Sequence, residues 1–187
     1  MLKKIVLLSS IGALLTGCAS SGQNAYYQLP VQTQNFSVKS AIPAERQVQF
    51  LGVTLPDYLN NTGIVYQTSD VTYTVAQQNL WSGSLKSQVE QRVLANLNTA
   101  LPQWLVGWQT TGSDKSLALS LNSFHGRYDG RVVIRGEWTY VKGQTLTTRP
   151  FERVLIQPND GYESLVATLA QGLTEETKAM AQYIAAD

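Results

Sequence analysis

Two long stretches of the chain repeat their apolar residues every third or fourth position, which is the period of a helix that buries one side. In residues 85–101 the apolar stripe consists of Leu85, Val89, Val93, Leu97 and Leu101, with Leu94 beside it. In residues 161–185 the stripe consists of Tyr162, Val166, Leu169, Leu173, Met180 and Ile184. We therefore expect two long helices, each with one side packed against the rest of the fold.

Residues that commonly cap or stop helices lie at the ends of both stretches. Ser82 or Ser84 can cap the start of the first helix, and Pro102 ends it. Asp160, followed three residues later by Glu163, resembles a capping box at the start of the second helix.

Elsewhere apolar residues alternate with polar ones, which is the period of a strand with one buried face. Strands are predicted at residues 26–29, 47–55, 64–67, 71–75, 116–124, 131–141 and 146–156, and residues 32–46 are predicted to form a polar loop. Turn-forming residues at 126–130 and 142–143 separate the last three strands, so we expect an antiparallel meander. Trp138 alternates inward on the middle strand and is predicted to be a core residue.

The order of these elements decides the fold class. Strands precede each helix, in the order β…β–β–β–α–β–β–β–α, which predicts an α/β (α+β) domain. We expect a two-layer sandwich in which a mixed, largely antiparallel sheet carries the two long helices on one face.

The chain begins with the features of an export signal. Lys3 and Lys4 precede an apolar run over residues 5–15, which small residues follow. The run is much shorter than the roughly 20 residues that a membrane-spanning helix needs. We therefore interpret this segment as an N-terminal export leader and not as a permanent membrane-spanning helix.

Cys18, the single cysteine, directly follows this leader, and Leu15-Thr16-Gly17-Cys18 resembles a bacterial lipobox. Such a signal implies that a diacylglycerol is attached to the thiol, that the chain is cut before Cys18, and that an acyl chain is then added to its amino group. The alternatives are an ordinary leader with a chance cysteine, or a buried core cysteine. Ala19 and Ser20 follow Cys18 where an Asp would favour retention at the inner membrane, so we expect the outer membrane.

The predicted organisation is a cleaved leader at 1–17, a lipidated tether at 18–25 and a single periplasmic domain at 26–187. With 43% hydrophobic residues, the chain can bury a sizeable core. The 14 basic and 13 acidic residues are scattered, which argues against a nucleic-acid partner. A single cysteine leaves no internal disulfide and no thiolate metal site, so we expect no cofactor beyond the acyl groups on Cys18.

Candidate catalytic groups are sparse. His125, the single histidine, falls where a strand meets a turn and is predicted to be a turn or surface residue rather than a base. No G-x-S-x-G elbow and no glycine-rich phosphate loop occur in the sequence. The acidic pair Glu175-Glu176 is expected on a solvated helix face, and Asp129-Gly130 is explained by turn chemistry.

Aromatic residues are the remaining signal. The segment Leu55-Pro56-Asp57-Tyr58-Leu59 is expected to expose apolar residues in a turn, and exposed aromatic residues are enriched at protein interfaces. Tyr58, Leu59 and Trp81 are therefore candidate partner contacts. Trp81 and Trp104 can instead close the ends of the first helix, and core packing is the simpler explanation for each residue.

Several short segments, taken in order, resemble one family over nearly the whole mature chain. They are YYQLP at 26–30, LPDYL at 55–59, GIVYQTSDV at 63–71, NLW at 79–81, LANL at 94–97, Phe124 with GRYDG at 126–130, GEW at 136–138 and RPF at 149–151. The set is similar to the auxiliary lipoproteins of ABC-type transporters, in particular those of paraquat-inducible transport systems.

This resemblance implies an outer-membrane lipoprotein that faces the periplasm and adopts a two-layer α/β fold. It implies an MCE-domain partner that spans the periplasm and, through it, an inner-membrane protein, in a system that moves lipid between membranes and supports envelope integrity. Ring-like self-assembly is a further implication. The family has no accepted catalytic residues, and only Cys18 carries over as a functional residue.

Three hypotheses remain from the sequence. The first is a non-enzymatic docking lipoprotein at the outer membrane. The second is a periplasmic lipid carrier with an apolar pocket between helices and sheet. The third is a periplasmic hydrolase that uses His125 or the scattered acidic residues.

Overall fold

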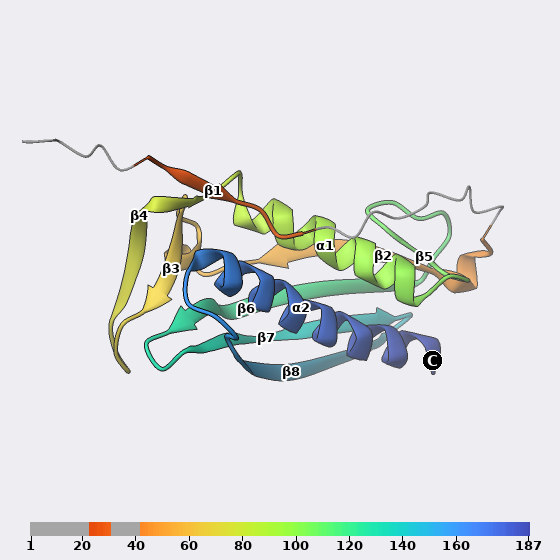
Figure 1. Ribbon diagram of the computed structural model, residues 1–187. Coiled ribbons are helices and arrows are strands. Elements are labelled where there is room, and N and C mark those ends of the chain that lie inside the picture. The colour runs from red at the N-terminus through yellow and green to blue at the C-terminus, as the bar shows by residue number, and fades with distance from the viewer. Residues whose placement is uncertain (1–22, 31–41) are drawn as a thin grey trace, which may run out of the picture.

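The computed structural model describes residues 23–30 and 42–187 as a curved sheet with two helices on one face (Figure 1). The helices are α1 (Leu85–Ala100) and α2 (Tyr162–Ala185), and two short 3-10 turns are η1 (Ala44–Arg46) and η2 (Asp57–Leu59). The strands are β1 (Ala25–Tyr27), β2 (Gln47–Thr54), β3 (Gly63–Gln67), β4 (Tyr73–Trp81), β5 (Leu105–Gly107), β6 (Lys115–Arg127), β7 (Arg131–Lys142) and β8 (Thr145–Ile156). Cys18 and the predicted leader lie outside the described residues.

The long strand β6 organises the sheet. It pairs antiparallel with β7 along most of its length, and β7 pairs antiparallel with β8. On its other side, β6 pairs parallel with β2 over its first half and with β3 at its end. Strand β5 joins β2, while β4 and then β1 continue from β3. The two long ladders make the mixed sheet largely antiparallel, which confirms the predicted fold class and the meander.

Apart from shifts of one or two residues elsewhere, the strands differ from the prediction in three places. Strand β6 runs through His125 to Arg127 instead of stopping at Phe124. Strand β4 covers Tyr73–Trp81, although only 71–75 was predicted, because pairing with β3 and β1 holds its polar second half in the sheet. Strand β5 was not predicted, since three residues are too few to show an alternating pattern.

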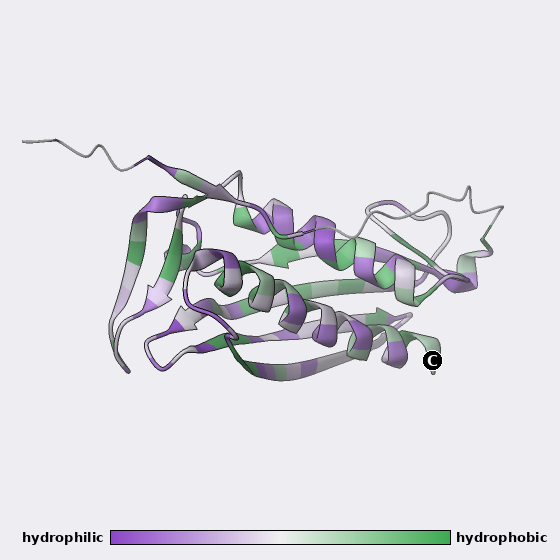
Figure 2. Cartoon of the chain, viewed as in Figure 1, coloured by the Kyte–Doolittle hydropathy of each residue, from purple (hydrophilic) through white to green (hydrophobic). Residues whose placement is uncertain are grey.

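Both helices lie within a residue of their predicted bounds, and hydrophobic and hydrophilic residues alternate along each (Figure 2). The hydroxyl of Ser84 accepts a hydrogen bond of 3.5 Å from the N–H of Ser87, which confirms Ser84 as the cap of α1. The predicted capping box of α2 is wrong. Its N-cap is Gly161, in the left-handed region at φ 97°, and no side chain caps this end.

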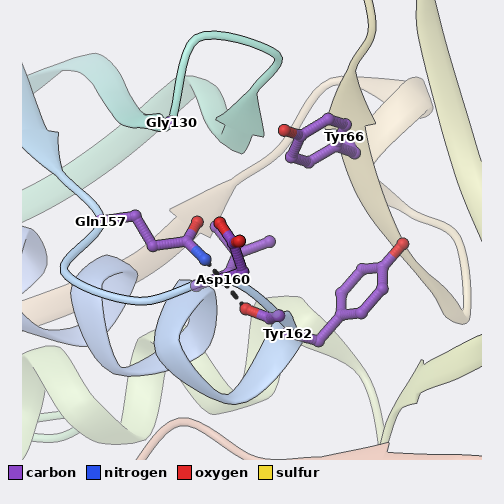
Figure 3. Close-up of a pocket in the computed structure, with 7 residues that line it drawn as sticks. Tyr66, Gly130, Gln157, Asp160 and Tyr162 are labelled. Carbon is purple, nitrogen blue, oxygen red and sulfur yellow. Dashed lines mark hydrogen bonds between the residues drawn. The ribbon is translucent and has the colours of Figure 1, made fainter.

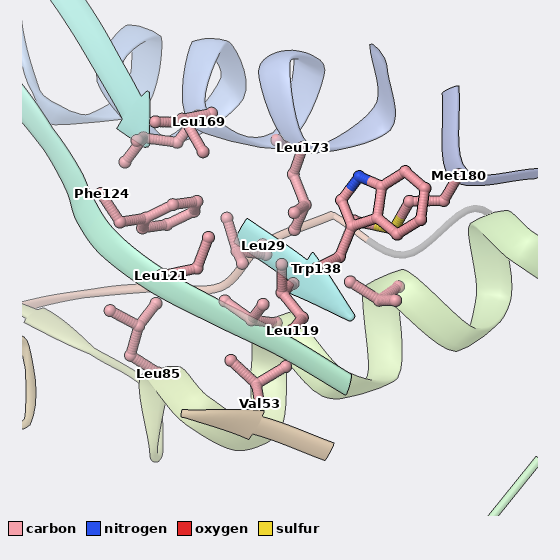
Figure 4. Close-up of a cluster of buried hydrophobic side chains, with 14 of the residues drawn as sticks. Leu29, Val53, Leu85, Leu119, Leu121, Phe124, Trp138, Leu169, Leu173 and Met180 are labelled. Carbon is pink, nitrogen blue, oxygen red and sulfur yellow. The ribbon is translucent and has the colours of Figure 1, made fainter. Parts of the chain in front are cut away.

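The core lies between the helices and the sheet. Leucines of both helices meet Leu119, Leu121 and Phe124 of β6 there, and Trp138 of β7, only 3% exposed, packs among them as predicted (Figure 4). Helix α2 lies close to β7 because Gly172 faces Ile134: a Cβ atom at Gly172 would stand 2.5 Å from the Cδ1 atom of Ile134. The described core is thus filled by side chains.

A polar layer joins the two helices, which run side by side in the same direction (Figure 1). The buried Arg92 of α1 donates to the Ala170 carbonyl at 3.2 Å and to the Thr174 hydroxyl at 2.9 Å. Asn96 donates to the hydroxyls of Thr174 and Thr177. No carboxylate within the described part of the chain pairs with Arg92, and burial lowers the pKa of its guanidinium.

Among the described helices, none is long and apolar enough to cross a membrane.

Candidate functional site

A cavity of about 310 Å³ lies where α2 begins, at the end of the molecule that also holds β1, β3 and β4 (Figures 1 and 3). Four segments far apart in the sequence form it: β3, the β6–β7 turn, the β8–α2 connection and the first turn of α2. The lining residues are Tyr66, Gly130, Gln157, Asp160, Gly161, Tyr162 and Leu165.

The β8–α2 connection shapes one wall of this cavity. Gln157 donates its side-chain N–H groups to the carbonyls of Asn159, at 2.7 Å, and Gly161, at 2.9 Å. Its backbone N–H bonds the carbonyl of Gly130 at 2.9 Å. Gly161 adopts a positive φ that residues with a side chain rarely adopt. These bonds hold the connection in a tight bend ahead of α2.

Two tyrosines form the opposite wall. The hydroxyl of Tyr66 donates to the carbonyl of Arg127 at 2.7 Å, which fixes its ring. The ring of Tyr162 lies 6.1 Å from that of Tyr27 on β1. Burial, together with the neighbouring Tyr66 and Tyr27 hydroxyls, raises the pKa of Tyr162, so it is a neutral phenol at physiological pH.

Asp160 is the one acidic residue among those that line the cavity. It is exposed, and no hydrogen bond or ion pair links its side chain to any other described residue. In Figure 3, its carboxylate lies beside the amide of Gln157, across the cavity from the rings of Tyr66 and Tyr162. The cavity therefore combines hydrogen-bond acceptors on one side with aromatic rings on the other.

A second cluster of aromatic residues lies on the sheet face that the helices do not cover. The ring of Tyr73 lies 5.3 Å from that of Tyr58 and 5.0 Å, edge to face, from that of His125. The hydroxyl of Tyr58 donates to the Asn122 carbonyl at 2.7 Å, and burial raises the pKa of this hydroxyl. Arg135 lies at the margin of the cluster, in an ion pair with Glu152.

The expectation that Leu55 and Leu59 are exposed in a turn is wrong. The turn η2 folds inward and buries Leu59, which is 1% exposed, in the core. Trp81 is buried as well, at 5% exposure, at the start of α1. Side chains this deeply buried have no surface with which to contact another protein. Of the three candidate partner contacts, only Tyr58 is half-exposed, and its role stays a prediction.

The expectation that His125 is a turn or surface residue is also wrong. His125 lies within β6 and is 2% exposed, because Tyr73 of β4 covers it. Its Nδ1 is 3.1 Å from the carbonyl oxygen of Gly126. Burial, followed by the positive charges of Arg127 and Arg135, lowers the pKa of its imidazole.

Glu176 does not lie on a solvated face, in contrast to its neighbour Glu175. Only 2% exposed, it accepts a hydrogen bond of 2.9 Å from the indole N–H of Trp138 and one of 2.9 Å from Nε of Arg153. Glu175 is exposed as expected and accepts a hydrogen bond from Gln171. The described residues hold no group of three or more His, Cys, Asp or Glu side chains that could bind a metal ion.

Sequence patterns did not point to the cavity. The sequence patterns predict Asp160 in a helix cap, Tyr66 in a strand and Tyr162 in the apolar stripe of the second helix. The one local signal is the sequence Asn159-Asp160-Gly161, which predicts a bend before the helix. Which residues that bend faces depends on the pairing of β3 with β6, a contact between distant segments.

Comparison with known proteins places this structure among transport lipoproteins. The family described as "ABC-type transport auxiliary lipoprotein component" matches residues 27–181. Proteins named "Intermembrane transport lipoprotein PqiC", from Escherichia coli (strain K12) and Shigella flexneri, are each 42% identical to the chain over 180 residues, which cover 95% of this chain and 96% of theirs. A solved structure of an uncharacterized protein is 43% identical, with a TM-score of 0.76 over 87% of this chain and 99% of its own.

The family match begins in β1 and ends in α2, so it includes strands β2 to β8 and α1 completely. The resemblance found from short sequence segments is therefore confirmed. Relatives of this kind are non-enzymatic transport components, which also confirms that the chain is not an enzyme. Both the sequence and the two-layer fold lead to the same conclusion: this chain belongs to the family of ABC-type transport auxiliary lipoproteins.

Proposed function

We propose that the chain is an outer-membrane-anchored periplasmic lipoprotein that docks an MCE-domain, periplasm-spanning partner at the outer membrane. It would act as a non-enzymatic component of an intermembrane lipid transport system, reach an inner-membrane protein through that partner, and support envelope integrity. The observation that carries the proposal is the 42% identity, over 95% of the chain, to relatives named intermembrane transport lipoproteins.

The anchor in this proposal is Cys18, which would carry a diacylglycerol and an N-acyl chain. Each buried methylene contributes about 0.8 kcal/mol of membrane affinity, and one acyl chain alone holds a protein only weakly. Three chains would hold it stably. A Cys18→Ser variant should therefore be lost from sedimented outer membranes and should fail to rescue a deletion strain. Retention of both properties would contradict the anchor.

The path of the chain from Cys18 suggests which end of the domain faces the membrane. Strand β1 begins at Ala25, seven residues after Cys18, and seven residues span at most about 25 Å. The β1 end would then lie near the leaflet, and the opposite end, which holds β5 and the C-terminus in Figure 1, would face the periplasm. A partner that spans the periplasm would meet this second end.

Trp108 offers a contact for such a partner. It follows β5, is 48% exposed, and rests with its ring 5.2 Å from the ring of the buried Phe50. Tryptophan is one of the residue types enriched among those that contribute most to binding at protein interfaces. We therefore place Trp108 within the docking surface.

Co-purification from solubilised envelopes tests this placement. The wild-type lipoprotein should retain the MCE-domain partner, and Trp108→Ala should retain much less. Tyr128→Ala is the matched control, because Tyr128 is also 48% exposed but lies in the β6–β7 turn, where it bonds Asp70 of the β3–β4 connection. Absence of the partner with the wild-type lipoprotein would contradict docking. Equal loss with both variants would contradict the docking surface alone. The mass of the purified complex would give the number of copies and test for a ring.

The lipid-carrier alternative has less support. The space between helices and sheet is filled by the core cluster. Two described cavities lie at helix ends, at about 310 Å³ beside the start of α2 and about 270 Å³ between the last turns of both helices. Pockets for drug-sized ligands measure about 300–1,000 Å³, so neither would enclose two acyl chains. A bound phospholipid in native mass spectra of the acyl-free domain would favour the carrier instead.

A further inference from the structure

We propose that the cavity beside the start of α2 binds the headgroup of an ethanolamine phospholipid, with its ammonium group between Asp160 and the two tyrosines. This inference rests on the membrane anchoring proposed above. It concerns a site on the domain itself and not the acyl chains on Cys18.

The polar lining favours a ligand that donates hydrogen bonds. The carboxylate of Asp160 has no partner within the described residues, and a carboxylate only accepts hydrogen bonds when ionised. Gln157 uses its side-chain N–H groups on the carbonyls of Asn159 and Gly161, which leaves its oxygen as the group available to a ligand. An ammonium group supplies three N–H donors and a positive charge, and so satisfies both oxygens.

The aromatic side of the cavity also favours a positively charged ligand. The rings of Tyr66 and Tyr162 stand across the cavity from Asp160 (Figure 3). A cation above a tyrosine ring is attracted by the negative face of the ring. Tyr66 is held by its hydrogen bond to the Arg127 carbonyl, and the ring of Tyr162 packs beside that of Tyr27. The site therefore needs little rearrangement to accept a cation.

Size and surroundings select a headgroup rather than a free amine. A cavity of about 310 Å³ accommodates phosphoethanolamine but not acyl chains. The first N–H groups of α2 carry partial positive charge, which disfavours an isolated cation and favours an anionic group beside it. A zwitterionic headgroup provides both charges. Choline would fit less well, because its quaternary nitrogen has no N–H to donate to Asp160 and Gln157.

The position of the cavity brings it to such headgroups. Tyr27, which touches the ring of Tyr162, lies nine residues after Cys18. A chain anchored at Cys18 would keep the cavity within a few tens of ångströms of the leaflet. Tethering at this distance raises the effective concentration of the second ligand to the millimolar range. A site with a dissociation constant on the order of 1 mM would then be occupied for a substantial part of the time.

The test is calorimetric titration of the full lipidated protein, in detergent micelles, with glycerophosphoethanolamine. We expect a dissociation constant on the order of 1 mM, since small ligands contribute limited affinity per atom. Glycerophosphocholine should bind at least about fivefold more weakly, because it lacks the charge-assisted hydrogen bonds. Nα-acetyl-lysinamide tests whether the cavity takes a protein side chain, and it too should bind more weakly.

Two variants and a matched control locate the site. Asp160→Asn should weaken binding about tenfold, the effect of losing one hydrogen bond to a charged group. Tyr162→Leu should weaken it by about threefold or more through the lost ring. Glu163→Gln removes the same charge three residues later, within α2 and outside the cavity lining, and should bind like the wild type.

Several results would overturn the proposal. The first is that glycerophosphoethanolamine does not bind at a concentration about 10-fold above the expected dissociation constant. The second is that the choline or lysine probe binds as tightly or more tightly. The third is that Asp160→Asn and Glu163→Gln change binding equally. Outer-membrane sedimentation of the same variants separates this inference from the proposed function. Asp160→Asn should still sediment with membranes through Cys18, whereas loss of anchoring in the wild type would contradict the lipoprotein proposal itself.

Discussion

Replacing Glu176 by leucine should destabilise the domain by about 2–4 kcal/mol. The carboxylate is 2% exposed and accepts hydrogen bonds from the Trp138 indole and from Arg153. Leucine has a similar volume but no acceptor. The indole N–H of Trp138, a side chain that is 3% exposed, would stay buried without a partner.

Losing the acceptor for Trp138 and losing the ion pair with Arg153 cost different amounts of stability. A buried donor left without an acceptor costs about 1–3 kcal/mol. The Arg153 side chain is 37% exposed, so water screens its ion pair with Glu176, and its loss costs about 1 kcal/mol. Glu176→Gln keeps an acceptor for Trp138 and loses only the ionic part, so it should cost about 1 kcal/mol.

Urea and thermal unfolding of the acyl-free domain at pH 7, both followed by tryptophan fluorescence, measure these differences in the free energy of unfolding. Each kcal/mol corresponds to about 2–4 °C in Tm for a domain of this size. Glu176→Leu should therefore lower Tm by roughly 4–16 °C. Glu175→Gln is the matched control, because its carboxylate is exposed and its loss should change stability by less than about 0.5 kcal/mol.

The unpaired indole can be isolated with a double variant. Trp138→Phe removes the N–H donor, so adding Glu176→Leu to it should cost less than Glu176→Leu costs in the wild type. If Glu176→Leu unfolds at the same urea concentration as Glu175→Gln, the buried acceptor does not stabilise the domain and the reasoning is refuted.

Three further changes test other parts of the structure. Burial lowers the pKa of His125 below its unfolded value of about 6.5, so the unfolded state binds a proton first as the pH falls. The free energy of unfolding of the wild type should therefore decline below that pH by up to about 1.4 kcal/mol per pH unit. A His125→Gln variant that keeps the full decline in urea titrations would contradict this. Gly172→Val should cost about 1–3 kcal/mol by pushing α2 off Ile134, seen as a lower Tm, while an unchanged Tm would mean that the helix shifts freely. Ser84→Ala should cost about 0.5–1 kcal/mol by removing the acceptor for Ser87, with Ser84→Asn restoring it in the same thermal scans.

Regular spacing explains why the helices and the long meander were predictable. Each apolar stripe defines one buried side over several turns, so the bounds of α1 and α2 follow within a residue. Strand β5 and the second half of β4 have no comparable pattern. Residues 76–79 of β4 are mostly polar, and they form a strand because β1 supplies a parallel partner at Asn79.

Burial of single polar residues was not predictable, because distant segments cause it. His125 is covered by Tyr73, and Glu176 is enclosed by Trp138 and Arg153. The bend before α2 has a local signal at Asp160, yet the tyrosine facing it comes from β3. Such a site depends on strand order, which a single sequence does not reveal.

The uncompensated guanidinium of Arg92 has a consequence for how accurately α2 is positioned. A slide of α2 by one turn, about 5.4 Å along its axis, would take the Ala170 carbonyl and the Thr174 hydroxyl away from this cation and leave its buried charge without these two acceptors. The hydrogen bonds of Arg92 therefore favour the observed alignment of the two helices. The contacts of Arg92 thereby also fix where Tyr162 stands relative to β3, although by helical rise Tyr162 lies about 12 Å from Ala170 and about 18 Å from Thr174 along α2.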